Sequence, residues 1–172
     1  MLLPGETYSF NREAGERSVQ RGYRYANVVV GNRLVPDVGG GICQITTTLF
    51  NAAAESGLDF PELHAHGIPV DYADPGGDAA VAWDYLDLKI TNGFDTPVVF
   101  GAWGEDGAVS VKVFGRPNES TYELEPVILE QYPEEGMNPG LLVETYRVEK
   151  QGGEIIKRQL LVRSRYQPSY PK

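Results

Sequence analysis

Glycine and proline are spread densely along this chain, and their spacing limits what it can fold into. There are 20 glycines and 12 prolines among 172 residues. Glycine adopts turn conformations that other residues avoid, and proline interrupts both helices and sheet ladders, so long regular elements are disfavoured over most of the length. We therefore expect short elements joined by many turns.

One stretch has a helical pattern. Between residues 42 and 56 the apolar side chains recur at helical spacing, and Gly57 provides a C-terminal stop. The stripe consists of Ile42, Ile45, Leu49, Ala52 and Ala53. The three threonines at 46–48 are mediocre helix formers. We predict one principal helix over about 42–56, whose stability depends on burial against a sheet.

The rest of the pattern is β. Short apolar or alternating runs, separated by turn signals such as Asn92-Gly93 and Asp106-Gly107, predict strands at 26–30, 34–35, 70–72, 86–91, 97–103, 108–114, 142–148 and 155–163. The first two strands would turn at Gly31-Asn32 and the last two at 151–153. One helix on a mostly antiparallel sheet is an α+β fold. Pro117 marks a boundary between a first domain, 1–117, and a small C-terminal β module, 118–172.

Composition excludes some partners. A net charge of −9 argues against nucleic acid, whose phosphates call for a basic face. No apolar run approaches the roughly 20 residues of a membrane helix. The chain starts within what reads as folded domain and ends within β structure, so we expect it to be an excerpt of a longer protein. The sequence leaves the oligomeric state open.

The single cysteine, Cys43, follows Gly39-Gly40-Gly41 at the start of the predicted helix. A thiol in the first turn feels the positive end of the helix dipole, which favours the thiolate. The backbone N–H groups of Cys43 and Gln44, beside Gly41, could form part of an oxyanion hole. The competing interpretation is a small buried apolar residue.

A nucleophilic thiol needs a base, and the chain has two histidines, His64 and His66. We favour His66 as the base and Asp78 as the acidic residue that orients it. Spacing alone does not separate Asp78 from Asp71, Asp84 and Asp87. A metal site of Cys43 with both histidines is a weaker alternative, because the spacing matches no recognised metal pattern. We expect no metal and no cofactor.

Several separated blocks in about residues 3–116 resemble the VanW family in sequence and order. The blocks are residues 4–11 (PGETYSFN), Gly15, Arg17, 22–23 (GY), 39–44 (GGGICQ), 46–53 (TTTLFNAA), His66, 69–70 (PV), Tyr72, 77–81 (GDAAV), 87–90 (DLKI), Asn92 and 113–115 (VFG). His64 is outside this pattern. The tail, with Gly136, Gly140 and Gly152-Gly153, is similar to a partial β module named for its five glycines.

The resemblance implies a bacterial cell-surface location, near peptidoglycan and linked to glycopeptide resistance. With Cys43 and His66, it leads us to expect a cysteine-dependent acyl-transfer or hydrolytic enzyme acting on peptidoglycan peptides. Asn11 and Arg17 would contact substrate, which the family match alone suggests. The rival hypothesis is a non-catalytic wall-binding or scaffolding module in which Cys43 is packing.

Overall fold

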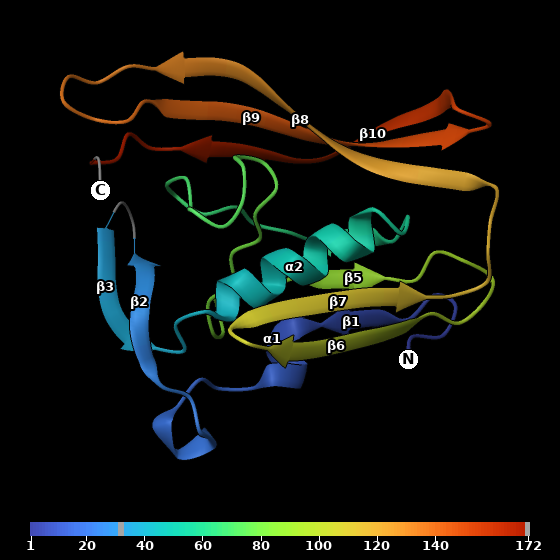
Figure 1. Ribbon diagram of the computed structural model, residues 1–172, viewed down its shortest axis with the longest axis horizontal. Helices are drawn as coiled ribbons and strands as arrows, with labels where there is room; N and C mark the ends of the chain where they lie inside the picture. Colours follow the sequence, from blue (N-terminus) through green and yellow to red (C-terminus); the bar gives the residue numbers. More distant parts are fainter. Residues whose placement is uncertain (31–32, 171–172) are drawn as a thin grey trace.

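The computed structural model describes residues 1–30 and 33–170 (Figure 1). In chain order its elements are β1 (Thr7–Ser9), α1 (Phe10–Ala14), the 3-10 turn η1 (Val19–Arg21), β2 (Tyr25–Val30), β3 (Arg33–Val38), α2 (Ile42–Ala54), β4 (Asp59–Glu62), β5 (Lys89–Thr91), β6 (Val99–Glu105), β7 (Ala108–Phe114), β8 (Ser120–Tyr132), β9 (Gly140–Gln151) and β10 (Glu154–Tyr166). One main helix with antiparallel strand pairs confirms the predicted α+β class.

The strands form two sheets and two hairpins around α2. One sheet has the order β1-β5-β4, the other β10-β9-β8, and the hairpins are β2-β3 and β6-β7. Helix α2 lies between the C-terminal sheet and the β6-β7 hairpin, and it contacts β7 and β8 (Figure 1). No helix in the described part of the chain is long and apolar enough to cross a membrane.

Helix α2 supplies the centre of the core. It begins at Ile42 as predicted, and it ends at Ala54, two residues before the predicted end. Gly57, with φ of +83°, follows in the left-handed conformation that stops helices. Phe50, which is 0% exposed, packs edge-on against Phe60. Burying a side chain of this size contributes about 1.5–3 kcal/mol, so the helix is held mainly by its packing.

Most predicted strands are present, four of them with longer bounds. The pairs β2-β3 and β9-β10 extend beyond the predicted hairpins, β7 matches 108–114, and β6 covers most of 97–103. The predicted turn at Gly31-Asn32 lies outside the described residues. Positive φ at both Asp106 (49°) and Gly107 (79°) gives the β6-β7 turn that the sequence predicts.

Two strand predictions need correction. The predicted strand at 70–72 is wrong, because this segment is an irregular loop that lines a pocket. The predicted strand at 86–91 is too long, since only Lys89–Thr91 forms β5. Upstream of β5 the backbone pairs elsewhere: the N–H of Phe10 donates to the carbonyl of Leu88, and Leu86 bridges to Ala82.

Strands β4 and β8 were not predicted from the sequence. Both contain a proline, Pro61 or Pro126, and both lie at a sheet edge. Proline is tolerated at an edge because its missing N–H leaves no ladder partner unpaired. The same residue lowers the strand signal when only the sequence is read.

Candidate functional site

The triple-glycine turn places Cys43 in the first turn of α2. Gly41 is the N-cap with φ of +91°, a conformation that L side chains rarely adopt. A Cβ on Gly40 would lie 2.1 Å from the Cβ of Ala26 on β2, so the turn also needs glycine for close approach. Ile45 makes the first α-helical backbone bond, to Gly41. Helix geometry therefore leaves the N–H groups of Cys43 and Gln44 without intrahelical acceptors.

The threonines of α2 hold the segment that carries Asp78. Thr46 and Thr47 are buried, and the Oγ1 of Thr46 donates to the carbonyl of Ala79 at 2.8 Å. The N–H of Ala79 donates to the Oγ1 of Thr47 at 2.9 Å. One turn further, the Nδ2 of Asn51 donates to the carbonyl of Gly77 at 2.8 Å. Residues that are mediocre helix formers thus serve as hydrogen-bonding groups toward the neighbouring segment.

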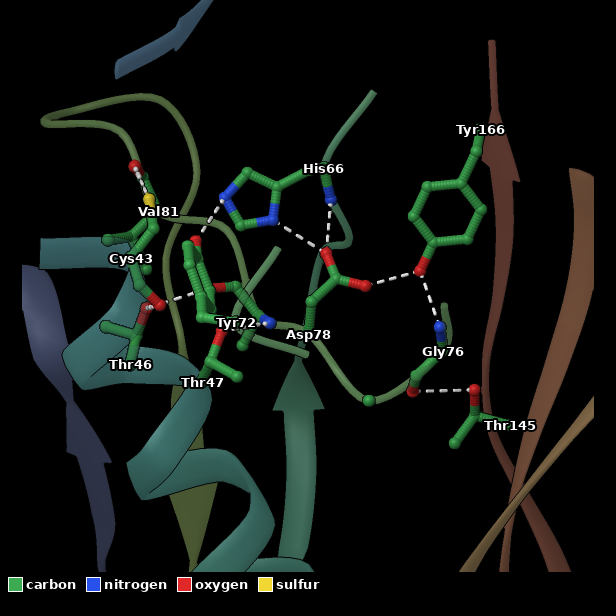
Figure 2. Close-up of polar contacts among 12 residues, drawn as sticks. Cys43, Thr46, Thr47, His66, Tyr72, Gly76, Asp78, Val81, Thr145 and Tyr166 are labelled. Carbon is green, nitrogen blue, oxygen red and sulfur yellow. Dashed lines mark hydrogen bonds and ion pairs between the residues drawn. The ribbon is translucent and has the colours of Figure 1, made fainter. Parts of the chain in front are cut away.

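His66 and Asp78 form a buried pair. The Nδ1 of His66 lies 2.6 Å from the Oδ2 of Asp78, and the backbone N–H of His66 donates to the same oxygen at 2.8 Å (Figure 2). His66 is 6% exposed and Asp78 is 1% exposed. A buried carboxylate accepting from Nδ1 fixes the orientation of the imidazole and leaves Nε2 available on the other side.

Nε2 of His66 faces the side on which Cys43 and Tyr72 lie. The hydroxyl of Tyr72 is 3.3 Å from Nε2, and the Sγ of Cys43 donates to the carbonyl of Val81 at 3.6 Å (Figure 2). Burial by itself raises the pKa of the Cys43 thiol. Hydrogen bonding to His66 and Val81, together with the positive charges of His66 and Arg17, brings that pKa below its ordinary value.

The pKa of the His66 imidazole shifts in the opposite direction to that of the Cys43 thiol. Burial by itself lowers the pKa of His66, but the hydrogen bond to Asp78 and the interactions with Cys43 raise it to about 9. A thiol whose pKa falls beside an imidazole whose pKa rises favours a thiolate–imidazolium pair over the neutral pair.

The second oxygen of Asp78 accepts a hydrogen bond from a residue of the C-terminal sheet. The hydroxyl of Tyr166, at the end of β10, donates to the Oδ1 of Asp78 and accepts from the N–H of Gly76 at 2.7 Å (Figure 2). The sequence analysis missed Tyr166. It lies 88 positions from Asp78, and no local motif marks it.

The other acidic candidates differ in their surroundings. Asp87 is buried and accepts from the Oγ of Ser9 and the N–H groups of Asn11 and Leu88. Asp84 is exposed in a turn, with φ of 60°. Asp71 is exposed and lines the same pocket as Cys43. Among the four predicted candidates, Asp78 has the hydrogen bond to His66.

His64 is turned toward a different partner. Its Nε2 lies 3.1 Å from the Oε1 of Glu62, and its carbonyl accepts from the N–H of Ala80. Within residues 1–30 and 33–170, no group of three or more histidine, cysteine and acidic side chains is placed to hold a metal ion. The structure therefore does not bring together the alternative set of Cys43, His64 and His66.

Asn11, which is buried, and Arg17, which is partly buried, belong to one hydrogen-bond network. The Nδ2 of Asn11 donates to the carbonyls of Ala82 and Leu86, and its Oδ1 accepts from the Nη2 of Arg17 at 2.7 Å. Asn11 thus holds the 82–86 loop. The guanidinium of Arg17 lies 5.5 Å from the rings of both Phe10 and Trp83, and its Nη1 is buried without a partner among the described residues.

A pocket of about 430 Å³ joins these groups. Cys43, Gln44, Gly41, His66 and Arg17 all line it. Its walls include apolar residues of the loop after His66, together with Trp83 and Tyr72, which are 47% and 40% exposed. A thiol, an imidazole, a guanidinium and a helix N-terminus therefore open to one space, a combination suited to a polar acyl substrate with negative charge.

Comparison with known proteins identifies the family of this chain. The model of the family described as "VanW like protein" matches residues 1–114. The uncharacterized protein YoaR of Bacillus subtilis is 36% identical over 114 residues, covering 66% of this chain and 38% of that protein. The vancomycin B-type resistance protein VanW of Enterococcus faecalis is 26% identical over 181 residues, covering 99% of this chain and 65% of that protein.

The chain thus spans less than two thirds of the length of either relative. No solved structure matches it at a significant level. The family model covers α2, with Cys43, and the loops that carry His66 and Asp78. The chain belongs to the VanW-like family.

Proposed function

We propose that this chain is a cysteine-dependent acyl-transfer or hydrolytic domain that acts on peptidoglycan peptides at the bacterial cell surface. The observation that carries the proposal is the shared pocket of Cys43 and His66, in which Asp78 holds the imidazole through a 2.6 Å contact. The wall context is supported by a relative named for resistance to vancomycin, an antibiotic directed at the cell wall.

The first half-reaction forms a thioester. The Cys43 thiolate attacks the carbonyl carbon of a peptide bond, and the electron pair of the carbonyl moves to oxygen. The N–H groups of Cys43 and Gln44 would bind that oxyanion. As the intermediate collapses, the carbon–nitrogen bond breaks and the leaving amine takes a proton from Nε2 of His66.

The second half-reaction releases the acyl group. Water or an amine attacks the thioester, Nε2 of His66 accepts the proton of the attacking group, and the Cys43 thiolate leaves. The hydroxyl of Tyr72 lies 3.3 Å from Nε2 of His66. A bound substrate would therefore displace this hydroxyl. Asp78 keeps the same oxygen toward Nδ1 in both steps.

Arg17 would bind a carboxylate of the substrate. Its guanidinium lines the pocket, and its buried Nη1 has no partner among the residues that the structure describes. The same guanidinium helps to lower the pKa of the Cys43 thiol. Asn11 would then act through Arg17, which it holds by a 2.7 Å hydrogen bond, rather than by touching substrate.

Turnover of peptidoglycan fragments by Cys43→Ala and Cys43→Ser tests the proposal. Both variants should lose turnover and keep the wild-type circular dichroism spectrum and melting temperature. Full activity in Cys43→Ala would eliminate the proposal.

The pH dependence of thiol alkylation separates the enzyme from its rival, a non-catalytic wall-binding module. The alkylation rate of Cys43 with iodoacetamide should rise with a midpoint below the ordinary thiol value of about 8.5. A thiol that stays inert until the protein is denatured would favour the binding module.

A further inference from the structure

We infer that Tyr166 is a positioning residue for the candidate site, so that the C-terminal sheet completes the arrangement of Cys43, His66 and Asp78. The inference rests on the proposed function for its catalytic meaning. Its geometric basis is the hydroxyl of Tyr166, which donates to the Oδ1 of Asp78 while Oδ2 faces the imidazole. The two oxygens of one carboxylate thus join β10 to His66.

The hydroxyl is held in a defined direction. It accepts from the N–H of Gly76 at 2.7 Å, so its own proton is directed to Asp78. The ring is 1% exposed and packs with Leu141 and Val143 of β9. Burial, followed by the charge of Asp78, raises the pKa of Tyr166, which keeps the phenol a donor over the whole working pH range.

The short loop before Asp78 is also attached to the C-terminal sheet. The Oγ1 of Thr145 on β9 donates to the carbonyl of Gly76 at 2.8 Å. Gly76 has φ of +92°, and a Cβ there would lie 2.5 Å from that Oγ1. The loop therefore requires glycine to lie this close to β9. Thr145 and Tyr166 hold the same loop, and Tyr166 also donates to the carboxylate of Asp78.

A free carboxylate can rotate about its Cβ–Cγ bond and present either oxygen, or neither, to Nδ1. In this site the backbone N–H of His66, the hydroxyl of Tyr166 and the imidazole share two oxygens, and Tyr166 takes the oxygen that His66 does not use. Without Tyr166, the buried Oδ1 of Asp78 would lose its hydrogen-bond donor. The carboxylate would then rotate toward another donor, which would weaken its contact with Nδ1 of His66. The imidazole would then lose part of the support that keeps it protonated.

The groups that titrate around this pair come from three elements. Cys43 from α2 and Tyr72 from the loop that follows His66 act on the imidazole side of the pair. Tyr166 from β10 faces Asp78, and Arg17 acts on Cys43. A change at Tyr166 should therefore be measured at both His66 and Cys43.

The test compares Tyr166→Phe with Thr145→Val in the full chain. Histidine-selective NMR follows the two imidazoles, and His64, which is bonded to Glu62, is an internal reference. In Tyr166→Phe the titration midpoint of His66 should fall from about 9 by roughly one pH unit or more. The iodoacetamide midpoint of Cys43 should rise in parallel.

Thr145→Val controls for loss of loop anchoring, because it removes a bond to the same loop and leaves Asp78 with both donors. It should leave the His66 midpoint within experimental error of wild type. An unchanged or raised His66 midpoint in Tyr166→Phe would overturn the inference. So would an equal fall in both variants, because the effect would then belong to the loop and not to the phenol.

Two further outcomes are distinguishable. If wild-type Cys43 alkylates with an ordinary thiol midpoint, the proposed function fails, and Tyr166 is judged on the His66 titration alone. If Tyr166→Phe does not fold, wild-type protein labelled with ¹³C at the tyrosine ζ carbons replaces it. The Tyr166 signal, assigned from the contacts of its ring with Leu141 and Val143, should shift as His66 titrates, and a signal that does not move would overturn the inference.

Discussion

Cys43 and His66 alter each other's protonation, and at the scale of single residues this coupling is the main chemical property of the site. The effect depends on partial burial, because water would screen the interaction between an exposed thiol and an exposed imidazole. Arg17, in the segment before η1, lines the same pocket, and its positive charge lowers the pKa of Cys43 further. These side chains come from segments far apart in the sequence.

Arg17 offers a prediction at this scale. Arg17→Gln should raise KM by about 10- to 100-fold for stem peptides with a free carboxylate, since a charge-assisted hydrogen bond contributes about 1.5–3 kcal/mol. The same peptides with an amidated carboxylate should show little change between wild type and variant. Steady-state kinetics with the paired peptides measures both effects.

Arg12→Gln is the matched control, because Arg12 is exposed and paired with Glu13. It should leave both KM values unchanged. An equal loss with acid and amide peptides in Arg17→Gln would contradict carboxylate binding and indicate a structural role beneath Trp83.

At the scale of elements, α2 performs two tasks on different faces. Phe50, Ala53 and Ala54 face the core, while Thr46, Thr47 and Asn51 bind the segment at 77–79. Thus α2 holds both Cys43, in its own first turn, and the backbone next to Asp78. The spacing between Cys43 and Asp78 depends on this face of the helix.

Thr47→Val tests this role of α2. The substitution conserves shape and leaves the N–H of Ala79 without its acceptor, so the free energy of unfolding should fall by about 1–3 kcal/mol. The alkylation midpoint of Cys43 should also rise, because Asp78 is adjacent to Ala79. Urea denaturation and iodoacetamide kinetics give the two readings.

Thr48→Val is the neighbouring control. The Oγ1 of Thr48 donates to the carbonyl of Gln44 within the helix. Its replacement should change stability by less than about 0.5 kcal/mol and leave the alkylation profile as in wild type. If Thr48→Val matched Thr47→Val, the effect would come from helix propensity and not from the bonds to Ala79.

At the scale of the whole molecule, stability comes from one core that α2 shares with strands on both sides. Its buried members include Leu2, Leu49, Phe50, Leu88 and Ile90, and β8 and β10 add partly buried leucines. A second, smaller cluster surrounds Tyr166. The C-terminal sheet is therefore packed against the same helix that carries Cys43.

Phe50→Ala should test how much this core contributes. Removing a large, fully buried ring should lower the free energy of unfolding by about 3–5 kcal/mol. Leu129→Ala, at a side chain that is 45% exposed on β8, is the control, and it should change stability by less than about 1 kcal/mol. Urea denaturation of both variants measures this, and a loss below about 1 kcal/mol in Phe50→Ala would contradict the single shared core.

The sequence by itself determined the local features of this protein. The apolar stripe at 42–56 identified α2, glycine turns identified most hairpins, and the glycines before Cys43 placed the thiol at a helix start. These features depend on backbone conformation and on periodic burial, which act over a few neighbouring residues. The ordered blocks of residues also identified the family.

Only the tertiary structure decided which groups meet. It joined Asp78 to His66, turned His64 to Glu62, and brought Tyr166 to the carboxylate from 88 positions away. It also turned the 70–72 segment into a pocket wall where the sequence predicted a strand. Such outcomes depend on how buried polar groups find partners across the fold, and that pairing leaves no periodic signal in the chain.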